Sequence, residues 1–544
     1  MRHTWIYFVS GLASVASLPA EAEGKPLPRL ERNGEATQLI VDGQPYLVIG
    51  GELHNSSPSS PEYMAPIWDK LARNNVRTVI GAASWELVEP EEGRFDFTAV
   101  DDQIRQARKR GIRLVLIWFG GYKNAESTYT PSWVRRDATR FPRVERDPNA
   151  KPKGIAAYLG YNPTISVFSE NLVEADARAF SALMQHIRQV DRDQTVIMVQ
   201  VENEVGLLGD SRDRSPPAVA AWQQQVPPSL IAYLRDNRTR LRPGLLQAWE
   251  RNGARETGTW GEVFGSDKVG DEIFMAWAFA RYIERVAVAG AAQHALPMYA
   301  NAWLGPQAKS PEPGDYPSGG PVARMMDVWK AAAPSLDLLA PDIYVDDFAG
   351  TLSDFKRDDN PIFVPEAKND PGNLFVSIGE YGGIAFSPFG IEDAADGGEL
   401  FQAYEVLNEM TAPIARAQAQ GTMRGFRIVK GGQHQTQLGG YTISISGPVS
   451  TVGAFGAGTG AEAEAVDTGY GLAINSGEDE FLVVGRGISA RFSAPGTKVE
   501  IDSTQEGEFV AGRWHPLRTM NGDERYFLFP NDKLRIIRFK LARR

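Results

Sequence analysis

A regular alternation of short apolar strands with helical segments constrains the fold of this chain most. Short apolar candidate strands recur along the first 390 residues of the 544-residue chain, with helical patterns between them. The eight candidate strands are residues 46–51, 77–81, 113–119, 195–201, 297–301, 336–344, 361–364 and 383–386. Eight strand–helix units predict an α/β fold, the (β/α)8 or TIM barrel, in which parallel strands close into a cylinder.

An open, doubly wound sheet is the structural alternative for such an alternation. That fold normally carries a Gly-rich phosphate-binding turn after its first strand. Residues 50–54 (GGELH) end the first candidate strand and do not form such a turn. The barrel is therefore the better prediction, with helices expected at residues 61–74, 170–190 and 394–418.

The chain divides into three predicted parts. Residues 1–22 resemble a signal peptide, with Arg2 and His3 before an apolar stretch and an A-x-A site that ends at Ala22. Residues 23–420 are expected to form the barrel. We therefore expect a periplasmic or secreted protein that is cleaved near Ala22.

Residues 421–544 are expected to form a separate all-β, sandwich-like domain. Helical periods vanish after about residue 420, and short alternating segments are separated by Gly, Asn and Asp turns. The segments expected as strands are residues 440–446, 469–475, 480–484 and 525–529.

Composition excludes several classes of function. The net charge of −11 and the pI near 5.3 give nothing that attracts nucleic acid or an anionic membrane. The absence of cysteine removes disulfides and thiolate chemistry, and the six histidines lack metal-ligand spacing. No membrane span, metal or cofactor is expected, and no sequence feature sets an oligomeric state.

Two glutamates are the candidate catalytic residues. Residues 200–206 (QVENEVG) close the fourth strand, and Glu366 ends the seventh, so Glu204 and Glu366 are expected at the barrel mouth, where active sites of this fold lie. A glycosidase needs one carboxylic acid to protonate the leaving oxygen and one carboxylate to attack or activate water. Glu202 is the alternative acid, because two-residue alternation puts it on the strand face of Glu204. Glu380 is the alternative to Glu366, although it is expected at the opposite rim.

Further polar and aromatic residues at the strand ends are candidates for sugar binding. Flat aromatic faces suit stacking on sugars, while tryptophans also serve as ordinary core residues. His54 is equally compatible with a structural role. The candidate substrate-binding residues are Asn203, Glu52, His54, Trp85, Glu86, Asn124, Trp303 and Tyr344.

These motifs together resemble glycoside hydrolase family 35, the retaining β-galactosidases. The resemblance rests on residues 50–54 (GGELH), 85–90 (WELVEP) with 93–97 (GRFDF), 200–206 and 361–366. It implies that Glu204 is the acid/base and Glu366 the nucleophile. The C-terminal segment looks like the β-domain of a bacterial branch of the family, a domain of formerly unknown function.

The chain also departs from the common family pattern. Val205 and Asn55 stand where the family commonly has Tyr, and residues 120–124 (GGYKN) replace its usual Ala-Glu pair on the third strand. These positions would shape the sugar subsite, so they bear on substrate choice more than on the reaction.

The expected function is that of a retaining exo-glycoside hydrolase that releases terminal β-linked galactose from oligosaccharides or plant-type polysaccharides. The same double displacement on a β-glucoside or an α-L-arabinofuranoside is the nearest alternative. A non-catalytic carbohydrate-binding protein that kept the barrel is an alternative of a different class.

Overall fold

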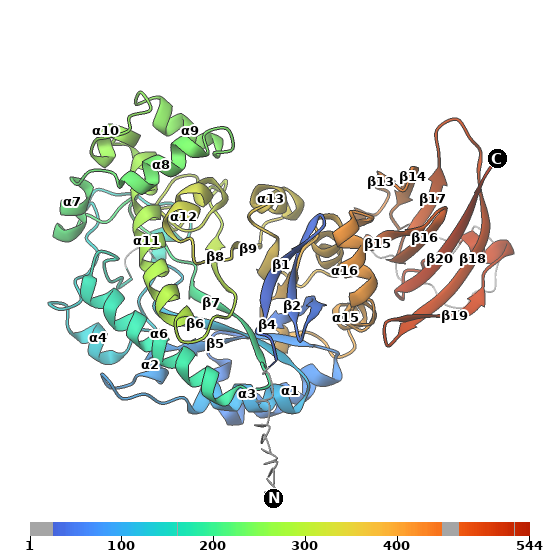
Figure 1. Cartoon of the computed structure of the whole chain (residues 1–544), viewed down its shortest axis with the longest axis horizontal. Coiled ribbons are helices and arrows are strands. Elements are labelled where there is room, and N and C mark those ends of the chain that lie inside the picture. The colour runs from blue at the N-terminus through green and yellow to red at the C-terminus, as the bar shows by residue number, and fades with distance from the viewer. Residues whose placement is uncertain (1–24, 160–161, 449–466, 527) are drawn as a thin grey trace, which may run out of the picture.

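The computed structural model describes residues 25–159, 162–448, 467–526 and 528–544. The predicted signal peptide at residues 1–22 lies outside these residues. The described chain forms a helix-wrapped barrel domain followed by an all-β domain to one side (Figure 1). In the described part of the chain, no helix has the length and apolar character required to cross a membrane.

Eight parallel strands form the barrel, as the sequence predicted. Neighbouring strands pair in the order β10-β11-β4-β5-β6-β7-β8-β9. A parallel bridge between Ile343 and Ala367 joins the two outer strands, and the N–H of Ile343 donates to the carbonyl of Glu366 (2.9 Å). The strands are β4 (Val48–Glu52), β5 (Thr78–Ser84), β6 (Arg113–Lys123), β7 (Val196–Asn203), β8 (Met298–Trp303), β9 (Leu338–Asp342), β10 (Phe363–Ala367) and β11 (Ala385–Pro388).

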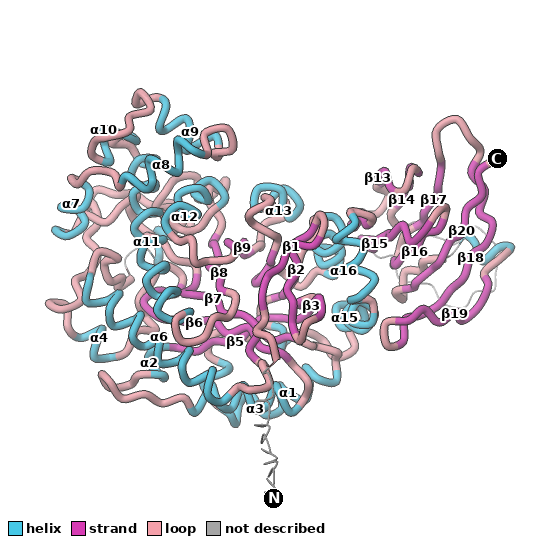
Figure 2. The backbone as a smooth tube through the Cα atoms, viewed as in Figure 1, coloured by secondary structure: helices cyan, strands magenta, loops and turns pink. Residues whose placement is uncertain are grey.

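Helices surround this barrel, and the smooth trace in Figure 2 shows them outside the strands. In chain order they are η1 (Ser57–Ser59), α1 (Pro61–Arg73), α2 (Trp85–Val88), α3 (Thr98–Lys109), α4 (Ser132–Arg136), α5 (Ala156–Leu159), α6 (Glu170–Val190), α7 (Pro216–Trp222), α8 (Pro228–Asp236), α9 (Pro243–Glu250), α10 (Trp260–Phe264), α11 (Lys268–Ala291), η2 (Ala323–Met325), α12 (Met326–Ala332), α13 (Phe348–Phe355), α14 (Pro371–Phe375), η3 (Val376–Glu380), η4 (Ile391–Asp393), α15 (Glu399–Glu409) and α16 (Thr411–Gln420).

Helix boundaries follow local chemistry. The side chain of Ser169 accepts a hydrogen bond from the N–H of Leu172 and caps α6, which spans the predicted residues 170–190. The single helix expected at residues 394–418 is wrong, because the structure divides it into α15 and α16 at Met410. Pro413 explains the break, since proline lacks an N–H and is tolerated only in the first turn of a helix.

A small antiparallel sheet covers one end of the barrel interior, which the sequence patterns did not predict. It consists of β1 (Arg29–Asn33), β2 (Ala36–Val41) and β3 (Gln44–Tyr46). Leu39 and Val41 of β2 are buried in one apolar cluster with inward-facing residues of the barrel strands. Because this cluster fills the interior, the barrel is a packed core whose open polar end carries the cavity.

The C-terminal domain is all-β, as predicted, and its two antiparallel sheets enclose a separate apolar core. The strand expected at residues 525–529 is not found among the described residues of that range, because the 3-10 helix η5 (Gly522–Tyr526) covers residues 525 and 526. The strands are β12 (Met423–Val429), β13 (Gln433–Leu438), β14 (Tyr441–Ser446), β15 (Thr468–Gly477), β16 (Glu480–Arg486), β17 (Ser489–Ser493), β18 (Val499–Val510), β19 (Arg513–Thr519) and β20 (Arg535–Arg543).

One face of the larger C-terminal sheet packs against the barrel domain. The apolar cluster of the barrel continues into this sheet and includes Tyr470 and Leu472 of β15. The ring of Tyr470 stacks on that of Phe375 at a centroid distance of 5.3 Å, and Arg427 pairs with Asp370 at 3.0 Å. The two domains therefore share a continuous apolar interface.

Leu472→Ala tests this interface. The side chain of Leu472 is fully buried in the shared cluster, so its truncation should lower the free energy of unfolding by about 2–5 kcal/mol. Urea unfolding followed by circular dichroism measures the change. Leu517→Ala is the matched control: Leu517 is 56% exposed in the same domain, and its loss should cost less than about 0.5 kcal/mol. Equal effects of the two substitutions would contradict the interface.

Candidate active site

A cavity of about 560 Å³ opens at the carboxyl ends of the barrel strands. This is the end at which enzymes of this fold place their active sites. The lining residues are Asn55, Lys123, Asn124, Glu204, Trp303, Leu304, Gln307, Asp342, Tyr344, Val345, Glu366 and Phe389. Five of the predicted site residues are among them: Glu204, Glu366, Asn124, Trp303 and Tyr344.

The backbone at the end of β7 departs from a regular strand. Glu202 and Glu204 have φ angles of 64° and 46°, a left-handed conformation that costs a non-glycine residue about 1–3 kcal/mol. The carboxylate of Glu202 accepts hydrogen bonds from the N–H groups of Gly121 (3.0 Å) and Tyr122 (2.7 Å). The expectation that Glu202 shares a strand face with Glu204 is therefore wrong, because the left-handed backbone interrupts the two-residue alternation. Glu204 lines the cavity and Glu202 does not.

Lys123 orients the amide of Asn203. Its ammonium group donates to Oδ1 of Asn203 (2.9 Å) and to Oδ1 of Asn124 (2.5 Å). An amide that accepts through Oδ1 must present Nδ2 elsewhere, and Nδ2 of Asn203 is buried without a hydrogen-bond partner among the described residues. This unpartnered amide nitrogen belongs to the residue that directly precedes Glu204 in the chain.

Glu366, near the end of β10, is held in place by a tyrosine. The hydroxyl of Tyr344 donates to Oε2 of Glu366 at 2.8 Å. The second oxygen, Oε1, is buried and accepts no hydrogen bond from any described residue. The tyrosine fixes one oxygen and leaves the other for a reacting atom.

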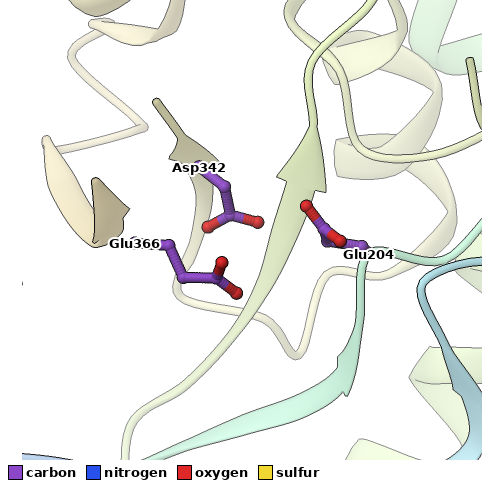
Figure 3. A group of neighbouring side chains, drawn as sticks. All are labelled: Glu204, Asp342 and Glu366. Atoms are coloured by element: carbon purple, nitrogen blue, oxygen red, sulfur yellow. The ribbon is translucent and has the colours of Figure 1, made fainter. Parts of the chain in front are cut away.

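Asp342 joins Glu204 and Glu366 in an acidic trio, defined as these three carboxyl groups. One oxygen from each lies within 4.8 Å of the other two, and Figure 3 shows their carboxyls facing a common space. The amide of Asn301 donates from Nδ2 to Asp342 (2.8 Å) and accepts at Oδ1 from the N–H of Glu204 (2.9 Å). All three are buried, so their charges interact strongly.

The environments of Glu204 and Glu366 sort their protonation states. Burial, followed by the charge of Glu366, raises the pKa of Glu204 to about 8, against the lowering effect of Lys123. Burial also raises the pKa of Glu366, but Lys123 and the Tyr344 hydrogen bond oppose that rise. Glu366 therefore ionises before Glu204, and a proton remains on Glu204 near neutral pH.

Glu52 is brought close to this group without lining the cavity. It is buried at the end of β4, and neither carboxyl oxygen has a hydrogen-bond partner among the described residues. Burial, followed by the charge of Glu366, raises the pKa of Glu52 well above its usual value.

Like Asn203 and Glu52, three further predicted residues do not line the cavity. Trp85 is buried in the core, where its indole N–H donates to Glu89 (2.8 Å). Glu86 pairs with Arg135 at 3.1 Å. Nε2 of His54 hydrogen-bonds Asp393 (2.7 Å).

The alternative carboxylate Glu380 lies at the other end of the barrel. It is exposed at the end of η3, before β11 begins. It lines a separate pocket with Pro361 and Ile362, the residues that precede β10. Glu366 is thus the carboxyl that faces Glu204.

A cation or cofactor is not required to explain the acidic trio. Three carboxylate oxygens at this spacing could hold a cation. Donors from the protein already occupy part of the set, because Asn301 donates to Asp342 and Tyr344 donates to Glu366. These hydrogen bonds, together with the raised pKa values of Glu204 and Asp342, offset part of the repulsion within the trio.

The sequence patterns did not identify Asp342 as a site residue. They also did not predict that Asn301 hydrogen-bonds the backbone of Glu204. Asp342 lay inside the strand expected at residues 336–344, so it did not mark a strand end. The structure ends β9 at Asp342. The adjacent Pro341 was the available signal, since proline is uncommon inside a central strand.

Family comparisons match two separate parts of the chain. Residues 60–239 match a family model described as β-galactosidase, that of glycoside hydrolase family 42. Residues 400–531 match a domain of unknown function (DUF5597).

Curated relatives match over a limited length. A β-galactosidase of Xanthomonas manihotis is 27% identical over 205 residues, which cover 37% of this chain and 30% of the relative. β-Galactosidase 13 of Arabidopsis thaliana is 25% identical over 158 residues, which cover 27% and 18%. The chain thus spans less than a third of the length of these relatives.

Solved structures are similar at lower identity. The β-galactosidase of Bacillus circulans sp. alkalophilus is 14% identical with a TM-score of 0.44, over 68% of this chain and 57% of that one. The catalytic domain of a β-amylase from Paenibacillus polymyxa is 12% identical with a TM-score of 0.44, over 67% and 99%. The barrel itself is established by the strand order and pairing described above.

Glu204→Gln tests the raised pKa through stability. Because the pKa of Glu204 is about 8 in the folded state and 4.5 ordinarily, the wild type should lose stability as pH rises from 4.5 to 8. Glutamine does not titrate, so the variant should be more stable than the wild type at pH 8 by at least about 1 kcal/mol, one pKa unit. The two should be nearly equal at pH 4.5. Urea unfolding at both pH values measures this.

Glu380→Gln is the matched control for this measurement. It removes an exposed carboxylate of the same type at the other end of the barrel, so the pH dependence of stability should follow that of the wild type. A Glu204→Gln variant with an unchanged pH dependence would contradict a buried, protonated Glu204.

Proposed function

We propose that this protein is a glycoside hydrolase that acts by double displacement at Glu204 and Glu366. The observation that carries the proposal is the pair of buried carboxyls at the barrel mouth, with one oxygen of each within 4.8 Å of the other. Carboxyls about 5–5.5 Å apart are typical of retaining enzymes, whereas inverting enzymes leave about 6.5–9.5 Å for a water molecule. The short separation supports retention.

In the first step, Oε1 of ionised Glu366 attacks the anomeric carbon. Tyr344 holds the other oxygen of Glu366 in place. As the bond between the anomeric carbon and the glycosidic oxygen breaks, the proton of Glu204 passes to that oxygen, so the leaving group departs as a neutral alcohol. The products of this step are a glycosyl ester on Glu366 and an ionised Glu204.

In the second step, water enters the place of the leaving group. Glu204, now a carboxylate, takes a proton from the water as its oxygen bonds to the anomeric carbon. The ester bond breaks, and Glu366 recovers its electron pair and its charge. Two inversions at the same carbon give net retention, and Glu204 regains the proton for the next cycle.

Terminal β-galactosides are the proposed substrates, and the enzyme is proposed to be exo-acting. Two features support this choice: the match of residues 60–239 to a β-galactosidase model and the family 35 motifs. In this proposal Nδ2 of Asn203, which has no hydrogen-bond partner among the described residues, holds a sugar hydroxyl, and Trp303 offers an aromatic face in the cavity. Val205 and Asn55 keep β-glucosides and α-L-arabinofuranosides as the alternatives.

Glu366→Gln tests the assignment of the nucleophile. Glutamine keeps the size of the side chain but cannot attack, so kcat/KM for an aryl β-galactoside should fall by at least about 10³-fold. Glu380→Gln is the control and should keep wild-type kinetics. Retained turnover in Glu366→Gln, or an equal loss in both variants, would rule out this site.

A panel of aryl glycosides tests the sugar and the stereochemistry. The β-galactoside should be hydrolysed fastest, and proton NMR should detect the β-anomer of the sugar before mutarotation. Faster hydrolysis of a β-glucoside or α-L-arabinofuranoside would change the proposed substrate to that sugar and leave the proposed mechanism unchanged. A first-formed α-anomer from a β-galactoside would refute double displacement.

A further inference from the structure

Asp342 is fixed against the proposed acid by a single amide. Asn301 donates from Nδ2 to Oδ2 of Asp342, and through Oδ1 it accepts from the backbone N–H of Glu204. One carboxyl oxygen of Asp342 lies within 4.8 Å of one of Glu204, and the two carboxyls face each other in Figure 3. Oδ1 of Asp342 is buried and has no hydrogen-bond partner among the described residues. Asp342 is only 2% exposed. Asp342 is therefore shielded from solvent and held beside Glu204 by Asn301.

The groups that face Asp342 favour its neutral form. The facing carboxyls are Glu366 on β10, Glu204 after β7 and Glu52 on β4, and the phenols are Tyr299 and Tyr344. Burial, followed by the charges of Glu366, Glu204 and Glu52, raises the pKa of Asp342 well above its usual value. Lys123 lowers the pKa of Glu204, Glu366 and Glu52.

A hydrogen bond between two carboxyls requires a proton on one of them. Asn301 offers its N–H to Oδ2 of Asp342, so the remaining oxygen of Asp342 is the one that can carry a proton toward Glu204. When Glu204 is neutral, it needs its own proton for the glycosidic oxygen. When Glu204 is ionised, it is a buried carboxylate that requires a donor.

We propose that Asp342 is a positioning residue that stays protonated and donates a hydrogen bond to the Glu204 carboxylate formed when the leaving group departs. The proposal rests on the proposed function and deepens it by adding a third carboxyl to the acid pair. Through the cycle the proton of Glu204 moves to the leaving oxygen and is replaced from water, while Asp342 keeps its own proton. The donor strengthens Glu204 as an acid because it stabilises the conjugate base.

Two substitutions separate this role from its alternatives. Asp342→Leu removes the donor and puts an apolar side chain of similar shape in its place. Asp342→Asn is the conservative variant, because its amide can accept from Asn301 and donate to Glu204 without titrating. Both are compared with the wild type on a dinitrophenyl and a methyl β-galactoside, or on the same pair of the sugar that the panel selects.

The leaving group reveals whether acid catalysis is affected. A methyl glycoside needs protonation to depart, so Asp342→Leu should lower its kcat/KM by about 10- to 100-fold, the worth of a hydrogen bond to a charged group. A dinitrophenyl leaving group needs no proton, so its kcat/KM should fall less than about threefold. Asp342→Asn should recover most of the methyl glycoside rate.

The pH profile of kcat/KM gives an independent readout. Loss of the donor should raise the pKa of Glu204 and move the alkaline limb of the Asp342→Leu profile to higher pH, while Asp342→Asn stays near the wild type. An ionised Asp342 would predict the opposite, because both variants would then remove a negative charge and move the limb to lower pH. Equal losses on both substrates without a shift would indicate a purely structural role.

Failure of the proposed function would look different from either outcome. If the wild type hydrolysed no glycoside, or if Glu366→Gln kept full activity, the site itself would be wrong. If the wild type is active and Glu366→Gln is not, only the behaviour of the Asp342 variants decides the role of Asp342. The proposal would be overturned if the alkaline limb of the pH profile moved to lower pH in both variants, or if both substrates lost the same factor in kcat/KM.

Discussion

Crowding of buried carboxyls at one end of the barrel is the constraint on which the site depends. The acidic trio and Glu52 meet where solvent cannot screen their repulsion. Among the lining residues that the structure describes, Lys123 is the cation. Its ammonium group is hydrogen-bonded to Asn203 and Asn124. Because one cation cannot balance four carboxylates, most of the carboxyls are neutralised by retained protons. The same crowding gives Glu204 and Glu366 the different protonation states that the proposed acid and nucleophile require.

The scaffold supports this crowding from the opposite end. Leu39 and Val41 fill the barrel interior away from the cavity, and the shared interface with the C-terminal sheet adds apolar burial outside the barrel. None of the described C-terminal residues lines the cavity. Stability is thus concentrated in apolar layers, while the left-handed backbone at Glu202 and Glu204 concentrates strain at the mouth.

The strands and the pair of carboxyls at the barrel mouth could be predicted from the sequence, whereas the finer contacts could not. The alternation of short apolar segments with helical patterns located all eight strands, and strand ends located Glu204 and Glu366. Trp85 was misjudged because an aromatic residue at a strand end looks the same whether it faces a cavity or the core. The positive φ of Glu202 is a tertiary effect with no signal in a two-residue period. Asp342 was missed because its position at a strand end depends on where β9 stops, and sequence periodicity locates strand boundaries only to within a few residues.

The bridge between Ile343 and Ala367 gives the site a mechanical weakness. It is the junction at which the eight-stranded sheet meets itself, and the chain on its two sides carries Asp342, Tyr344 and Glu366. The parallel pairs within the sheet are held by longer ladders elsewhere, for example between β5 and β6. Fraying at this junction would separate Tyr344 from Glu366 while the remaining strands stay paired. The proposed activity should therefore be lost on gentle heating before the fold is lost.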